Sequence, residues 1–280
     1  SSRGTPLCKH GQVSRLEDLQ ERRWARPIVA MARRFFGIQG LDLGALIALE
    51  LFTTVMPLVL IGYARAKRFS ADVLVGTLFV DMVGADGRAA ARIHREFGRA
   101  SGIEQVWNPI GLASFLVWGI PMSLTVGRMF AAAWQRPQYS AVQRIWRGVA
   151  WFLIYLFVAF VNEELLLISD RALAQPPLFL GALLVSMCFW GLTPTILVPG
   201  VKPSRRLLID AGLPGAIVNV LILRGVVRIV FPLLLSGWDG FGPVGVALTI
   251  MTWCGTLGVV WVAVACAGAV LTERAWLQSA

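Results

Sequence analysis

Apolar runs of about 20 residues recur along this chain, and they constrain its fold more than any other feature. A helix of about 20 residues spans the hydrocarbon core of a bilayer. Of the 280 residues, 56% are hydrophobic and 15% are charged, whereas soluble domains carry roughly 25% charged residues. A transmembrane β-barrel would be built from short alternating segments instead. The sequence therefore predicts an all-α, polytopic membrane protein.

Six transmembrane helices are predicted within a domain that covers residues 41–271. The spans are expected at about 41–63, 109–134, 149–169, 178–199, 212–236 and 243–271. A basic arm with an interfacial helix precedes the domain at 1–40, and a tail follows it at 272–280. The connection 64–108 is too polar to cross a membrane, and its periodicity predicts amphipathic helices.

Lys and Arg are distributed unevenly between the connecting segments. The arm and the loops 135–148 and 200–211 are basic, whereas 170–177 holds only Arg171 and 237–242 holds no basic residue. Short loops rich in Lys and Arg stay in the cytoplasm. Both termini and the tail are therefore predicted to be cytoplasmic. The net charge of +10 fits this topology and contact with anionic headgroups, so no nucleic-acid partner is expected.

The stretch LILRGVVRIVFPLLL at 221–235 carries two arginines inside an apolar span. Arg224 and Arg228 are four residues apart, so they share one face of a helix. A charge at the bilayer centre costs about 2.5–3.5 kcal/mol on insertion scales, so such groups face a partner or water. Guanidinium groups also match the geometry of phosphates. We interpret this face as part of a polar cavity that suits an anionic lipid headgroup.

Polar residues on other spans extend this interpretation. By depth, Glu50 is the expected partner of the first arginine, and Glu163 or Glu164 lies nearer to the second. Arg128, in the second span, has no acidic residue at its depth. The alternative is that Glu50 and Arg224 form a buried ion pair that only fixes helix register. The candidate cavity residues are Glu50, Arg128, Asn162, Glu163, Glu164, Asn219, Arg224 and Arg228.

Prolines interrupt the predicted spans and free backbone carbonyls there. The hinge candidates are Pro57, Pro121, Pro214 and Pro232, and static bends are the alternative. The two histidines, His10 and His94, lie outside the spans, and no catalytic motif, metal-ligand spacing or phosphate-binding loop occurs. The four cysteines form no CxxC pair. We therefore expect a protein that is not an enzyme and holds no metal or cofactor.

Three parts of the chain carry a family resemblance. They are ALIALELFTTVMPLVLIGYA at 45–64, RIWRG at 144–148, and LLIDAGLPGAIVNVLILRGVVRIVFPLLLS at 207–236 followed by FGPVGVALTIMTW at 241–253. These stretches resemble the YihY/BrkB family of bacterial inner-membrane proteins, once labelled ribonuclease BN. The chain differs from that family at Glu50, where an aromatic or small residue is more frequent. The resemblance implies a six-helix inner-membrane protein with both ends inside, tied to envelope integrity and to movement of lipid or glycolipid.

Three functions follow, in order of preference. The first is transport or flipping of an anionic phospholipid or glycolipid. The second is a scaffold for envelope assembly that transports nothing and binds envelope proteins. The third is a proton-coupled solute transporter that uses Glu50 and Glu163 or Glu164. Each is compatible with a homo-oligomer.

Overall fold

The computed structural model describes residues 25–69, 91, 104–171, 176–222, 229–230, 233–238, 241 and 243–279. These residues form helices joined by turns and loops, and no strand occurs among them. The all-α prediction is therefore confirmed for this part of the chain. The predicted amphipathic helices in 70–103 and the first 24 residues of the arm lie outside the described residues, apart from position 91.

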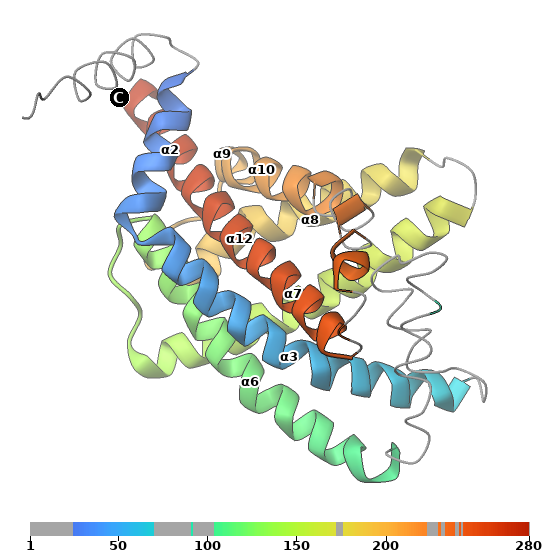
Figure 1. Cartoon of the computed structure of the whole chain (residues 1–280). Helices are drawn as coiled ribbons and strands as arrows, with labels where there is room; N and C mark the ends of the chain where they lie inside the picture. Colours follow the sequence, from blue (N-terminus) through green and yellow to red (C-terminus); the bar gives the residue numbers. More distant parts are fainter. Residues whose placement is uncertain are drawn as a thin grey trace, which may run out of the picture.

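Six long helices make up most of the described structure (Figure 1): α2 (Ala25–Gly37), α3 (Gly40–Phe69), α6 (Glu104–Ala133), α7 (Ala141–Arg171), α8 (Pro176–Leu197) and α12 (Pro243–Ser279). Several of these helices are longer than the apolar runs in the sequence, because the polar residues at their ends are also helical. α7 begins eight residues before the predicted span, after a loop that contains Pro137. α8 begins at a proline pair, where a missing N–H costs nothing, and ends before Pro199 and Gly200.

Among the described residues, three helices are long and apolar enough to cross a membrane: Ala141–Asn162, Pro176–Leu197 and Ala247–Glu273. They correspond to the predicted third, fourth and sixth spans. Arg26–Gly37 and Gly40–Thr54 make a fourth if this pair, bent by 67°, is counted as one span. The bend lies at Gln39, a non-glycine residue with a φ of 55°. Six spans are not confirmed by the described residues.

Glycines let the central helices approach closely. α3, α6 and α12 run side by side in Figure 1, and each contacts the other two. A Cβ atom on Gly258 of α12 would overlap the carbonyl oxygen of Gly44 on α3. One on Gly148 of α7 would lie 2.7 Å from the Ser123 hydroxyl of α6. Without a hydrophobic driving force in lipid, such small-residue contacts are a main source of helix association.

An aromatic cluster joins α7, α8 and α12. Its rings have centroids 5.3 to 6.3 Å apart and belong to Trp151, Tyr155, Phe189, Trp190 and Trp261. Edge-to-face pairs of this kind add about 0.5–1.5 kcal/mol each beyond burial. The Trp151 indole N–H donates to the Thr193 hydroxyl at 3.1 Å, which fixes α7 against α8.

The predicted fifth span is not a regular helix in its described part. The chain forms α9 (Arg205–Leu207), the π-helix η1 (Leu208–Gly212), α10 (Leu213–Ala216) and the π-helix η2 (Ile217–Ile222). Pro214 has no N–H for the Asp210 carbonyl and its ring would clash there, so the turn before it widens. On this segment, Gly212 packs against the Met187 carbonyl and Gly215 against the Trp190 side chain.

Candidate functional site

Glu50 is the predicted cavity residue with the most developed polar surroundings. It lies ten residues into α3, about 15 Å along that helix, and is partly buried. Its Oε1 accepts a hydrogen bond from the Thr125 hydroxyl of α6 at 2.8 Å. Its Oε2 is buried and has no hydrogen-bond partner. This carboxyl therefore keeps an unused acceptor inside the bundle.

Arg128 lies one turn after Thr125 on α6, with an exposed side chain, and interacts electrostatically with Glu50. From the sequence alone Arg128 has no predicted acidic partner, because depth along a helix does not say which helices are neighbours. Contact between α3 and α6 places Arg128 near enough to influence Glu50, but no salt bridge joins these two described residues. We call Glu50, Thr125 and Arg128 the α3–α6 polar site.

A second polar cluster joins α7, α8 and η2. Asn162 of α7 donates to the Ser186 hydroxyl of α8 at 2.8 Å, and Asn219 of η2 donates to the same oxygen at 3.5 Å. Asn162 is 6% exposed, and its Oδ1 has no partner. Asn162 and Asn219 thus lie in one cluster with Ser186, a residue the sequence analysis did not single out. This cluster binds three elements together.

The remaining predictions fall partly outside the described residues. Arg224, Arg228 and Pro232 lie there entirely, so the pairing of Glu50 with Arg224 stays a prediction. Glu163, Glu164 and Pro57 belong to described helices, but their side chains are outside the description. Pro121 lies half-buried within α6.

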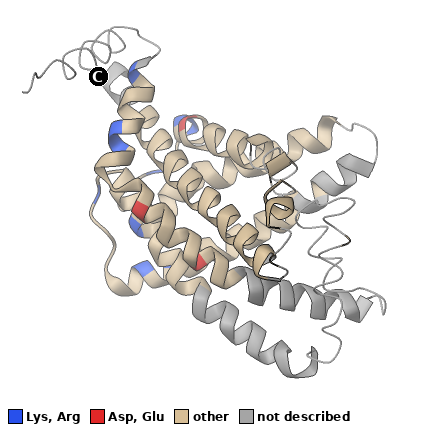
Figure 2. Ribbon diagram, viewed as in Figure 1, with Lys and Arg blue, Asp and Glu red and all other residues tan. Residues whose placement is uncertain are grey.

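The basic segments share one end of the bundle. In Figure 2 the Lys and Arg residues of the described part lie on the left side of the view, which includes α2 and α9. Arg34 donates to the Ala133 carbonyl at the end of α6 and to both carboxylate oxygens of Glu273 in α12. Arg147 donates to the Ile196 carbonyl at the end of α8. The arm and the two basic loops therefore meet there.

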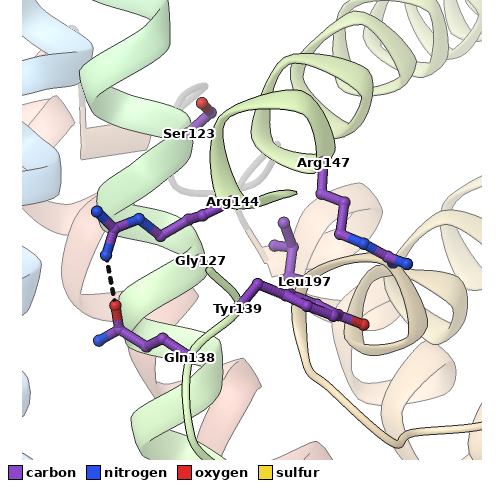
Figure 3. Close-up of a pocket in the computed structure, with 7 residues that line it drawn as sticks. All are labelled: Ser123, Gly127, Gln138, Tyr139, Arg144, Arg147 and Leu197. Atoms are coloured by element: carbon purple, nitrogen blue, oxygen red, sulfur yellow. Dashed lines mark hydrogen bonds between the residues drawn. The ribbon is translucent and has the colours of Figure 1, made fainter. Parts of the chain in front are cut away.

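A shallow pocket opens at this basic end (Figure 3). Its cavity volume is only about 10 Å³, room for roughly one water molecule, so a larger ligand would lie over the pocket and not inside it. Its lining comes from α6, the loop after it, the first turns of α7 and the end of α8, and consists of Ser123, Gly127, Gln138, Tyr139, Arg144, Arg147 and Leu197. The lining includes two guanidinium groups and no acidic side chain.

Neighbouring groups hold both arginines of the pocket. Arg144 donates to the Gln138 side-chain oxygen at 2.7 Å, and its Nε is buried without a partner. The Arg147 guanidinium lies 4.2 Å from the centroid of the Tyr139 ring. The Tyr139 hydroxyl donates to the Val198 carbonyl at 3.4 Å. From the sequence alone these arginines are interpreted only as topology signals, although the stretch RIWRG has basic and aromatic residues together.

Comparisons with family models, with curated proteins and with solved structures give no match for this chain. The resemblance to the YihY/BrkB family therefore stays a prediction. Among the described residues, no group of three or more His, Cys, Asp or Glu side chains is placed to hold a metal ion.

Proposed function

We propose that this protein moves an anionic phospholipid or glycolipid across a bacterial inner membrane, as a six-span protein with both termini in the cytoplasm. The observation that supports this most is the α3–α6 polar site. A charge sealed in a core would serve packing alone, whereas the Arg128 side chain is exposed. Charges within apolar helices that stay accessible are typical of substrate or ion pathways.

The chemistry of the site suits a phosphate-bearing headgroup. A guanidinium keeps its charge when partly desolvated and matches phosphate oxygens with a planar set of donors. The Thr125 hydroxyl already donates to Oε1 of Glu50, which leaves Oε2 of Glu50 as an acceptor for a headgroup hydroxyl. The acyl chains would remain in the bilayer beside α3 and α6. In the sequence we find no nucleotide-binding motif, so an ion gradient or mass action would supply the driving force.

Lipid movement in reconstituted vesicles tests the proposal. Vesicles would contain a fluorescent phosphatidylglycerol or, in a parallel set, a fluorescent phosphatidylcholine, and a membrane-impermeant quencher would report the label in the outer leaflet. We expect the wild-type protein to expose inner-leaflet phosphatidylglycerol much faster than protein-free vesicles do, and faster than phosphatidylcholine. Rates equal to those of protein-free vesicles for both lipids would contradict the proposal.

A non-transporting scaffold is the second candidate function, and the close packing of the helices favours it. The aromatic cluster joins α7, α8 and α12, and the glycine contacts join α3 to α12 and α6 to α7. A scaffold needs only a rigid bundle with exposed surfaces for envelope proteins. Under that function, substitutions at the α3–α6 polar site would change stability but no lipid movement.

A further inference from the structure

The pocket at the basic end has a composition that selects for anions. We propose that it binds the phosphate of an anionic lipid headgroup in the leaflet at this end of the bundle. Two guanidinium groups with no carboxylate in the lining leave an uncompensated positive charge. The inference deepens the proposed function by naming a headgroup site. The inference rests on the proposed function only where it concerns lipid movement, because lipid could bind at the pocket without being moved.

The arginines retain donors for a ligand. Each guanidinium carries five N–H groups. The hydrogen bonds described above use one N–H of Arg144, toward Gln138, and one of Arg147, toward Ile196. The Nε of Arg144 is buried, so the terminal N–H groups of the two arginines are the donors open to a phosphate oxygen.

The geometry holds the two charges on either side of the pocket. In Figure 3 Arg144 and Arg147 leave the same end of α7 and point to opposite sides, with Gly127 and Leu197 between them. Gln138 holds the first guanidinium and the Tyr139 ring holds the second. The two guanidinium groups point away from each other, so a bound phosphate would meet one of them directly and feel the other only through its charge. Because the side chains are already held, less conformational entropy is lost on binding.

The surroundings favour a lipid over a free anion. Val142, Ile145 and Trp146 lie on the same turns of α7 as the arginines, with 67%, 43% and 72% of their surface exposed. Exposed apolar and tryptophan side chains beside basic ones are typical of a helix end in the headgroup region. A site for a soluble phosphate would not need this apolar border. The border would contact the glycerol and upper acyl chains of the bound lipid.

Binding to purified protein in zwitterionic nanodiscs tests the inference. The probes are a short-chain phosphatidylglycerol, the matching phosphatidylcholine and inorganic phosphate, titrated into wild type, Arg144→Gln, Arg144→Gln/Arg147→Gln and the control Arg136→Gln. Arg136 is exposed and outside the pocket lining. We expect the double variant to bind phosphatidylglycerol about tenfold more weakly, the single variant to be intermediate, and the control to match wild type.

Several outcomes would overturn the inference. They are equal affinity of wild type and double variant, no preference for phosphatidylglycerol over phosphatidylcholine, or inorganic phosphate binding as tightly as the lipid. Arg147 also donates to the end of α8, so the double variant could lose binding because it misfolds. Arg144→Gln removes only the bond to Gln138 and therefore separates the two explanations. Thermal unfolding checks that each variant is folded. If the wild-type protein moved lipid but bound no phosphatidylglycerol at the pocket, only the inference about the pocket would be rejected. Intact binding without movement would reject the proposed transport alone.

Discussion

Arg34 on α2 holds Glu273 near the end of α12 through two hydrogen bonds of 3.0 and 2.6 Å, one to each carboxylate oxygen. The two residues are 239 positions apart in the chain. The same guanidinium reaches the Ala133 carbonyl at 2.7 Å, where α6 has a C-terminal carbonyl without a helical partner. One side chain therefore ties the start of the described chain to the ends of two other helices.

Replacing Arg34 with alanine is expected to lower the free energy of unfolding by about 1–2 kcal/mol. Arg34 is 13% exposed and loses three hydrogen bonds, but Glu273 is 44% exposed, so solvent screens part of the ion pair. Thermal unfolding in detergent measures the change, and Arg33→Ala, at an exposed neighbour, is the matched control. Equal destabilisation by both variants would show that the contact contributes nothing specific.

The glycine contact between α3 and α12 predicts a contrast between two glycines of α12. Gly258→Ala should destabilise the protein by about 1–3 kcal/mol, because the new methyl group overlaps the Gly44 carbonyl. Gly255→Ala should be neutral or stabilising by up to about 1 kcal/mol, since a Cβ there meets nothing within 4 Å. Denaturant unfolding of the two variants decides the matter. The account of this helix pair would be wrong if Gly258→Ala were as stable as Gly255→Ala.

Ser186 accepts hydrogen bonds from Asn162 and Asn219, so its removal leaves the buried amide of Asn162 and the partly buried amide of Asn219 without this acceptor. Ser186→Ala is expected to cost about 1–2 kcal/mol, near the upper end for polar contacts between membrane helices. Thr252→Ala serves as the control, because this exposed hydroxyl bonds only its own helix at the Leu248 carbonyl. Unfolding midpoints should separate the two. Coincident midpoints would argue that the cluster is loosely held.

Asp210, at the basic end, predicts a pH dependence of stability. Burial raises the pKa of Asp210 above its ordinary value of 3.8, while the weaker effect of Arg206 opposes the rise. The folded state therefore holds the proton more tightly than the unfolded state, and stability falls as pH rises from the ordinary pKa through the raised one. Asp210→Asn should remove this fall and should not destabilise the protein at neutral pH. Unfolding measured across acidic pH checks it, and parallel curves for the two proteins would refute it.

The sequence predicted those parts of the fold that depend only on length and hydrophobicity. The third, fourth and sixth spans match helices that are long and apolar enough to cross a membrane. The π-helices around Pro214 were missed, because a sequence pattern marks a proline as a bend without saying how the backbone adapts.

The candidate site was predicted by residue type but not by partner. Counting residues gives the depth of Glu50 along its helix and leaves open which neighbour it faces, so its link to Thr125 and Arg128 needed the packing of α3 on α6. The pocket was missed for another reason. Arg144 and Arg147 had an adequate explanation as topology signals, and only the fold brings Gln138 and Leu197 beside them.

The most direct test of the central claim is lipid movement by variants of the α3–α6 polar site. Arg128→Gln and Glu50→Gln would be reconstituted beside wild type and Arg33→Gln, an exposed arginine of α2, after thermal unfolding has shown that each is folded. We expect Arg128→Gln to slow phosphatidylglycerol movement about tenfold, since losing one charge-assisted contact raises a barrier by roughly 1.4 kcal/mol. Arg33→Gln should match wild type. Wild-type rates in both Arg128→Gln and Glu50→Gln would contradict the claim that lipid headgroups pass along this site.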